Sequence, residues 1–277
     1  MEYYYKIANT VIKVICKKNY LVEKMLPYTR FRIDSTKEDY LVNLFIVNSL
    51  PKCNGKLIYQ DNYNSVYQNN LLYRYIGRDY LIIENNFRTI DVYLKSSLLV
   101  INEKQLFNAI GLDSLLAKKM KLLLHSSFIT YKDQGLLFTA PSGTGKSTQA
   151  DLWKQYIDGV EIINGDRSII GIENNRVKAY GLPFCGTSMI SLSQECYLKA
   201  IVVLRQGKVN YLKKIAGKEA YKYLYSQINW IGWDTSLQIN MLKILDIIIE
   251  KTPIYYFECL PNYLAVNLLK KEIFKED

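Results

Sequence analysis

"LLFTAPSGTGKSTQADLW", residues 136–153, places a glycine-rich segment between an apolar run and a run of helix-forming residues. Within it, residues 140–147 match the phosphate-loop pattern A-x-x-x-x-G-K-S, with alanine in the first glycine position. This motif requires a strand before the loop and a helix after it, and the flanking residues predict both. The stretch therefore predicts a phosphate-binding loop, and its context argues against the alternative of a chance glycine-rich turn.

The polar residues of this phosphate loop (residues 140–147) suit a nucleotide. Gly143 and Gly145 allow backbone angles that turn N–H groups inward to form an anion-binding nest. Lys146 can reach the β- and γ-phosphates, Ser147 can bind Mg²⁺ through its hydroxyl, and Thr148 is placed to contact the α-phosphate. The helix N-terminus adds a favourable dipole. The predicted nucleotide-binding residues are Ala140, Pro141, Ser142, Gly143, Thr144, Gly145, Lys146, Ser147 and Thr148.

Two residues outside the loop are candidates for the chemistry. Asp166 ends the next predicted strand, in EIINGDRS, where phosphate-loop proteins hold Mg²⁺ or its water shell. The alternative is a surface turn at Gly165-Asp166. His125 is the only histidine in the chain, and a lone histidine at a strand start is more often structural than catalytic. Its predicted strand pairs with the strand that feeds the loop, so the alternative is a position near the transferred phosphate.

Residues 1–100 are predicted to form a strand-rich region. Aromatic and β-branched residues recur there in short runs, and polar turn residues such as PKCNG, DNYN and ENN separate several of them. This spacing is typical of an antiparallel meander. The tyrosines of the region either fill half-buried strand positions or offer a stacking platform for bases, and the first interpretation is favoured.

Residues 101–277 are predicted to form the domain that carries the loop. A helical period from residue 102 to 124 gives way to a hairpin whose second strand runs directly into the loop. No internal repeat or low-complexity linker interrupts the alternating signals that follow. The predicted elements are a hairpin at 125–140, a helix at 146–157, a strand at 160–164, a hairpin at 167–183, a strand at 198–207, helices at 217–228 and 235–251, a strand at 253–260 and a helix at 261–274.

Composition bears on partners and compartment. The formal net charge of +10 favours polyanions, but the lysines are dispersed and accompany no nucleic-acid recognition motif. Nucleotide phosphates and acidic peptides are therefore expected as partners rather than nucleic acid. The sequence shows no basic leader and no apolar run long enough to span a bilayer, so a cytoplasmic protein without a membrane partner is expected. The five cysteines are scattered without a C-x-x-C pair, which supports neither a disulfide framework nor a zinc site.

The combined motifs resemble the HPr kinase/phosphorylase family. The resemblance rests on a histidine-initiated strand, a tight turn, the loop strand GLLFTAPSGTGKS and an acidic residue after the next strand. Phosphoenolpyruvate carboxykinases share this arrangement. The sequence looks most similar to the small HPr kinase-like proteins, some of which sit beside bacterial peptide-modification systems and phosphorylate peptide serines. The specific motifs lie within residues 120–205. The resemblance implies an α/β fold with α+β character, in which a mixed β-sheet P-loop kinase core follows the strand-rich region.

The resemblance also implies an ATP- and Mg²⁺-dependent kinase. The γ-phosphoryl group would pass to a hydroxyl, with a serine of a small protein or peptide as the acceptor. Lys146 would neutralise phosphate charge, Ser147 and Asp166 would bind the metal, Asp166 would accept the proton of the nucleophile, and His125 would be the active-site histidine. The alternative is a nucleotide-binding regulatory or partner-recognition module without turnover. The acceptor, the donor nucleotide, a reverse reaction and homo-oligomerisation are left open.

The acidic position departs from the family pattern. The family has two adjacent aspartates where this chain has Gly165-Asp166-Arg167. One carboxylate would then serve as both base and metal ligand. Arg167 either adds a positive charge near the phosphates or projects into solvent, and the sequence does not choose between these.

A second departure concerns the acceptor side. YGLPFCGTSMIS, residues 180–191, sits where the family has a glycine-rich acceptor loop, but the family's arginine-glycine signature is missing. Gly181, Gly186 and Ser188 suit a mobile loop near the substrate. Cys185 is expected to be a packed loop residue rather than a reactive thiol, because no base is predicted beside it.

Overall fold

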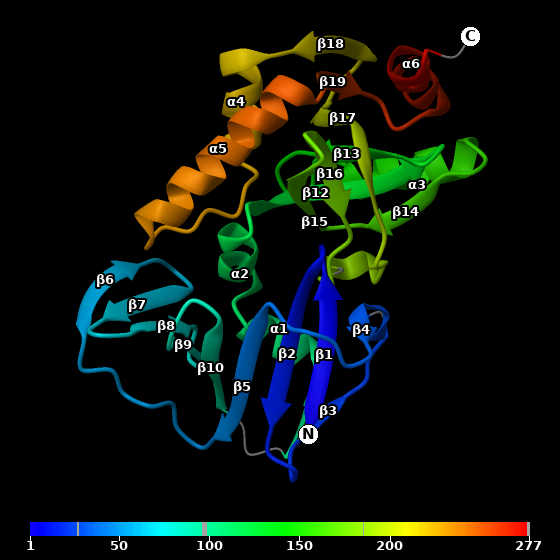
Figure 1. Cartoon of the computed structure of the whole chain (residues 1–277). Helices are drawn as coiled ribbons and strands as arrows, with labels where there is room; N and C mark the ends of the chain where they lie inside the picture. The colour runs from blue at the N-terminus through cyan, green and yellow to red at the C-terminus, as the bar shows by residue number, and fades with distance from the viewer. Residues whose placement is uncertain (27, 96–98, 185, 276–277) are drawn as a thin grey trace. The chain divides into compact units, whose positions relative to one another are not determined.

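The computed structural model describes residues 1–26, 28–95, 99–184 and 186–275, and Figure 1 traces the chain. The chain divides into two compact units. The first comprises Met1–Lys119 with Ile231–Thr235, and the second comprises Met120–Trp230 with Ser236–Asp277. Cys185, for which the sequence predicts a packed position, lies outside the described residues.

Strands dominate the first unit, as the sequence predicts. They are β1 (Glu2–Ile7), β2 (Thr10–Cys16), β3 (Leu21–Glu23), β4 (Arg32–Ile33), β5 (Tyr40–Val47), β6 (Lys56–Gln60), β7 (Asn64–Gln68), β8 (Leu72–Ile76), β9 (Tyr80–Glu84), β10 (Thr89–Lys95) and β11 (Val100–Asn102). Nine of them form one sheet in the order β4-β1-β2-β5-β10-β9-β8-β7-β6. Strict alternation of buried and half-buried residues along β2 and β5 shows that one face of this sheet lies on the core.

The predicted antiparallel meander is only partly correct. Strands β6 to β10 do form such a meander. In contrast, β5 pairs in parallel with both β2 and β10. Parallel neighbours need a crossover connection, and the long segments 17–39 and 48–88 supply the two crossovers. Short-range turn signals could not predict this pairing.

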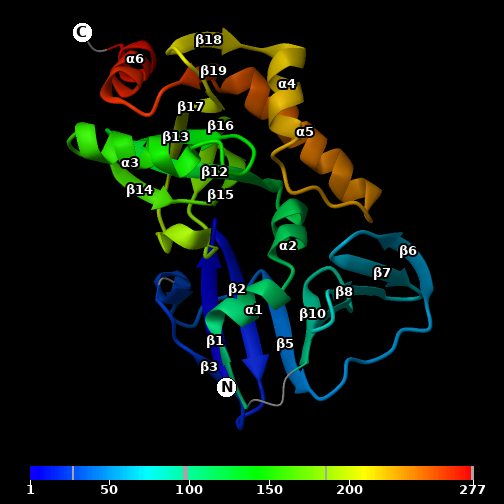
Figure 2. The same cartoon turned by 180° about the vertical axis from the view of Figure 1, so that it is seen from behind.

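Two short helices, α1 (Glu103–Ala109) and α2 (Leu112–Lys118), belong to the first unit. Figure 2 shows α1 lying against the face of the β1, β2 and β5 strands. A single helical stretch reaching residue 124 is wrong, because Gly111 adopts a left-handed conformation (φ +63°) between the helices and a strand begins at Lys121. The first unit accordingly ends at Lys119, after both helices, rather than at the expected residue 100.

The second unit is built on a mixed sheet, as predicted. Its strands are β12 (Lys121–Tyr131), β13 (Gln134–Thr139), β14 (Glu161–Asn164), β15 (Arg167–Glu173), β16 (Arg176–Tyr180), β17 (Glu195–Gln206), β18 (Tyr211–Ile215) and β19 (Ile254–Cys259). The first half of β12 pairs antiparallel with β15, and its second half pairs with β13 and β14. Strands β13, β17 and β19 run parallel to one another. Their carboxyl ends therefore share one edge of the sheet, which is where ligands bind in sheets of this kind.

The predicted hairpins at 125–140 and 167–183 are confirmed by the β12–β13 and β15–β16 pairs. Strand β18 was not predicted, because its sequence YLKKI is short and carries two lysines; it pairs with the distant strand β19. The helices of this unit agree with the expected ones: α3 (Lys146–Tyr156), α4 (Gly217–Tyr225), α5 (Thr235–Lys251) and α6 (Tyr263–Phe274). Each helix in the described ranges is too short or too polar to cross a bilayer.

Helix α3 is fixed to the sheet by a buried aromatic cluster. Trp153 is fully buried, and its ring lies 6.2 Å from that of Phe138 on β13, 6.5 Å from that of Tyr131 on β12 and 6.1 Å from that of Phe274 on α6. Figure 2 shows α3 lying across β12 and β13. The loop between β13 and α3 is thus anchored at both ends by packed elements.

Candidate functional site

The phosphate loop lies between β13 and α3, in the strand–loop–helix order that the sequence predicts. Gly143 and Gly145 have φ values of +77° and +110°, which side chains other than glycine rarely adopt. A Cβ atom added to either glycine would have no heavy atom within 4 Å. Glycine is therefore needed at both positions for backbone conformation and not for space. Positive φ at these positions is what an anion-binding nest requires.

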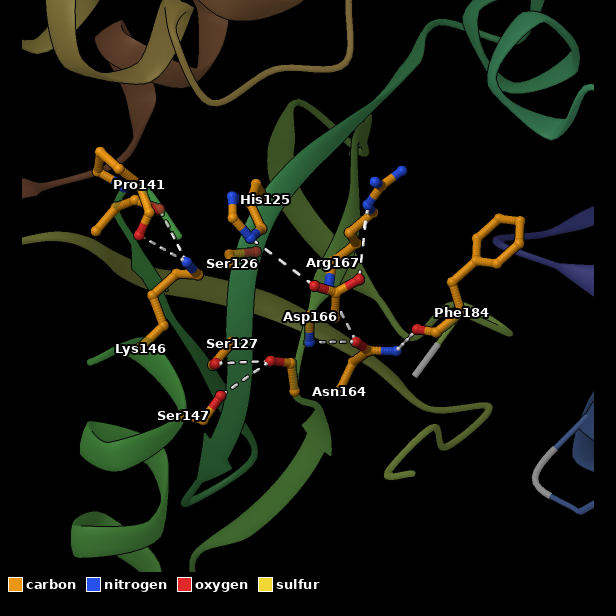
Figure 3. Close-up of polar contacts among 12 residues, drawn as sticks. His125, Ser126, Ser127, Pro141, Lys146, Ser147, Asn164, Asp166, Arg167 and Phe184 are labelled. Atoms are coloured by element: carbon orange, nitrogen blue, oxygen red, sulfur yellow. Dashed lines mark hydrogen bonds and ion pairs between the residues drawn. The ribbon is translucent and has the colours of Figure 1, made fainter. Parts of the chain in front are cut away.

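The ammonium group of Lys146 lies inside the phosphate loop. Its Nζ donates to the carbonyl oxygens of Ala140 at 2.9 Å and Pro141 at 3.1 Å, as Figure 3 shows. Burial lowers the pKa of Lys146, and the negative charge of Asp166 opposes this shift. The ammonium group is therefore positioned where an anion bound in the loop would meet it.

Ser147 connects the loop to the turn that follows β14. Its Oγ donates to the carbonyl oxygen of Gly165 at 3.3 Å, and the Oγ of Ser127 on β12 donates to the same oxygen at 3.1 Å. These contacts join the first turn of α3 to the Gly165–Asp166 turn (Figure 3). The side chains of Ser142 and Thr148, also predicted to bind nucleotide, are exposed on the loop and the helix.

The Asp166 carboxylate faces two cationic or ionisable neighbours without a close bond to either. Its Oδ1 lies 3.8 Å from Nε2 of His125, and its Oδ2 lies 3.6 Å from Nε of Arg167. Both distances exceed a hydrogen bond. The side chain is 35% exposed. A partly exposed carboxylate that is not tied up in short bonds can accept a proton or a metal ion.

His125 lies within β12 and not at its start, because the strand begins four residues earlier at Lys121. Its backbone N–H donates to the carbonyl oxygen of Gln227 at 2.9 Å. Burial and the positive charge of Lys146 lower the pKa of His125, whereas Asp166 raises it. The balance keeps the imidazole neutral near neutral pH, so it can both donate and accept a hydrogen bond.

This pKa gives a direct prediction, since His125 is the only histidine. Its imidazole resonances in an NMR titration should have a midpoint below the ordinary value of about 6.5. Asp166→Asn should move the midpoint lower, and Lys146→Ala should move it higher. Because the folded chain binds this proton less tightly than the unfolded chain, the stability contribution falls as the pH drops below about 6.5. A midpoint at or above that value would contradict the described surroundings of the ring.

Asn164 is a residue of this site that the sequence analysis missed. It is fully buried. Its Oδ1 accepts from the backbone N–H groups of Asp166 at 2.9 Å and Arg167 at 3.0 Å. Its Nδ2 donates to the carbonyl oxygens of Leu182 at 2.9 Å and Phe184 at 2.8 Å. One amide thus fixes the Asp166 backbone and ties it to the segment after β16. The signal was present, since asparagine two residues before the turn position commonly caps such a turn.

Replacing Asn164 by alanine should destabilise the second unit by about 2–4 kcal/mol, because this fully buried side chain makes four hydrogen bonds that the alanine cannot make. Urea unfolding followed by tryptophan fluorescence measures this change. Asn86 is a matched control, because its exposed side chain accepts from Arg88 at 2.8 Å and Thr89 at 2.7 Å in the same pattern. Asn86→Ala should cost less than about 1 kcal/mol. Equal losses for the two variants would show that Asn164 has no special role.

The residues present fit a nucleotide with Mg²⁺. Within the described part of the chain, no three His, Cys, Asp or Glu side chains gather into a metal cluster. Mg²⁺ does not need one, because it is usually held by one or two protein ligands together with substrate phosphates and water. The oxygen donors of Ser147 and Asp166 on either side of Gly165 are of the type that Mg²⁺ prefers.

Comparison with known proteins gives distant similarity to solved structures. No family model matches the sequence, and no curated protein matches it. Among solved structures, the chain is similar to the Hpr(Ser) kinase/phosphatase from Coxiella burnetii, with 11% sequence identity and a TM-score of 0.33. The match covers 55% of this chain and 97% of that chain. A relationship this distant leaves the activity open, so we base the proposed function on the geometry of the site.

Proposed function

We propose that this chain is an ATP- and Mg²⁺-dependent kinase that transfers the γ-phosphoryl group to a hydroxyl, with a serine of a small protein or peptide as acceptor. One observation carries this proposal. The Gly165–Asp166 turn is bonded to the phosphate loop through Ser147 at 3.3 Å, and the carboxylate of the same turn faces His125 at 3.8 Å. The candidate phosphate-binding loop is therefore bonded to the turn that carries Asp166, the candidate proton acceptor.

The loop residues Ala140 to Thr148 would hold the phosphates, with Lys146 compensating their charge. Ser147 and Asp166 would hold Mg²⁺, which supplies neutralisation of charge on the phosphoryl oxygens when it is bound. Catalysis of this kind depends mainly on positioning and electrostatics. The loop geometry and the buried ammonium group of Lys146 would supply both.

Asp166 would orient the acceptor hydroxyl and take its proton. The new O–P bond forms as the bond from the γ-phosphorus to the bridging oxygen of ADP breaks, and ADP leaves with the electron pair. The neutral imidazole of His125 would assist by a hydrogen bond to the Asp166 carboxylate or to the phosphoryl group. The loop contacts described above would bind phosphates and would not distinguish one nucleotide base from another. ATP as the donor is therefore part of the proposal.

The test is phosphoryl transfer by the whole chain. Purified protein is incubated with γ-labelled ATP, Mg²⁺ and the small proteins and peptides encoded beside its gene, and phosphorylated residues are located by mass spectrometry. We expect phosphoserine on one of them. Binding of ATP without any phosphorylated product would support the regulatory module instead. Absence of ATP binding would show that the loop interpretation is wrong.

A further inference from the structure

A short 3₁₀ turn, η2 (Gly186–Ser188), packs directly on the Gly165–Asp166 turn. Gly186 has φ +53°, and a Cβ atom added to it would lie 2.9 Å from Cβ and 3.1 Å from Cγ of Asp166. A Cβ atom added to Gly165 would lie 2.3 Å from Oγ of Ser188. The Ser188 hydroxyl therefore rests on the backbone of Gly165, one residue from the Asp166 carboxylate.

Hydrogen bonds on both sides of this turn hold it in place. Before it, the carbonyl oxygens of Leu182 and Phe184 accept from Asn164. After it, Ser191 bridges to Asn164, and the N–H of Leu192 donates to the carbonyl oxygen of Ile163 at 2.9 Å. Both flanks are thus bonded to the end of β14, which also positions Asp166. The approach of η2 to the site is built into the fold.

The same glycine separates this hydroxyl from the phosphate loop. The carbonyl oxygen of Gly165 accepts from Ser147, the first-turn serine of α3, at 3.3 Å. Ser188 contacts Gly165 from η2, and its side chain is exposed. A serine hydroxyl of this chain therefore contacts Gly165, which precedes the candidate base Asp166 in the chain and is bonded to Ser147 of the phosphate loop. A serine hydroxyl in this position has the chemistry that a phosphoryl acceptor needs.

We propose that Ser188 is an intramolecular phosphoacceptor of this site, which rests on the proposed kinase function. The Ser188 Oγ forms a bond to the γ-phosphorus of ATP as the bond to the bridging oxygen of ADP breaks. The hydroxyl proton passes to the Asp166 carboxylate, and ADP leaves. Covalent connection makes the effective concentration of this acceptor independent of protein concentration.

The test is the mass of the chain itself. The purified full-length protein is incubated with ATP and Mg²⁺ without any added acceptor, and intact mass spectrometry and phosphopeptide mapping follow. We expect one phosphoryl group, located on Ser188, with a rate per molecule that does not change when the protein is diluted. A Lys146→Ala chain mixed with the wild type should stay unmodified, because transfer occurs within one molecule.

Two serine variants complete the test. Ser188→Ala should lose the phosphoryl group, whereas Ser193→Ala should keep it, because Ser193 is an exposed serine nearby in sequence that lies outside η2. ATP turnover by the wild type with phosphate on another residue, or with none on the chain, would overturn this inference and leave the kinase proposal standing. Failure to bind and turn over ATP would overturn both the kinase proposal and the Ser188 inference. Titration with a fluorescent ATP analogue shows whether ATP binding is lost.

Discussion

Lys146→Ala is expected to weaken ATP binding by about 10- to 150-fold, the equivalent of losing hydrogen bonds from one charged group worth about 1.5–3 kcal/mol. Phosphoryl transfer should fall further, by at least about 10²-fold, because charge on the phosphoryl oxygens is compensated by a preorganised donor. The physical reason is the position of the ammonium group. It lies inside the loop, bonded to the carbonyl oxygens of Ala140 and Pro141.

Binding is measured by calorimetric titration with ATP and Mg²⁺, and transfer by release of ADP. Lys154→Ala is the matched control, because Lys154 is exposed on the same helix and far along it from the loop. It should leave both quantities unchanged within a factor of two. A thermal melt of each variant separates loss of function from loss of folding. If the Lys146 variant kept wild-type affinity and transfer, the loop would not be the phosphate site.

How far the sequence could be used depended on whether a feature was local. The glycine-rich loop, the hairpin that leads into it and the turn at Asp166 are local in sequence, and the structure has a strand before the loop and a helix after it, as predicted. The exact strand start before His125 was missed, because KLLL continues a helical period in the sequence and becomes strand only by pairing with β15. The parallel pairing of β5 was missed for the same reason, since both of its partner strands, β2 and β10, are distant along the chain.

The candidate site was likewise predicted only in part. Its loop residues and Asp166 carry a recognisable motif, whereas Asn164 acts through carbonyl oxygens that lie 18 and 20 residues further along the chain. The close packing of Ser188 on Gly165 is also tertiary, because it depends on the path of the chain after β16. Residue types and spacing could mark both regions as interesting. Only the fold shows that they meet at one turn.

Asp166→Asn should lower phosphoryl transfer by about 10²- to 10⁴-fold, the usual contribution of a positioned proton acceptor. ATP binding measured without Mg²⁺ should change by only a few-fold, because the loop that would hold the phosphates is untouched. The substitution preserves the shape of the side chain and the two backbone hydrogen bonds of residue 166. The backbone N–H donates to Oδ1 of Asn164 at 2.9 Å, and the carbonyl oxygen accepts from the N–H of Ser126 at 3.1 Å. The variant therefore removes charge and basicity without loosening the turn.

Asp158→Asn is the control for loss of a carboxylate, since Asp158 is exposed beyond the end of α3 opposite the phosphate loop. Transfer to a confirmed acceptor and ATP binding are measured for both variants, and the His125 titration is repeated in the Asp166 variant. A lower histidine midpoint would prove that the imidazole still lies beside residue 166, because the carboxylate charge raises the pKa of His125 in the wild type. With that geometry verified, wild-type transfer by the Asp166 variant would exclude this carboxylate as the base. Loss of transfer with ATP binding retained would separate the chemistry from nucleotide capture and assign it to the turn after β14.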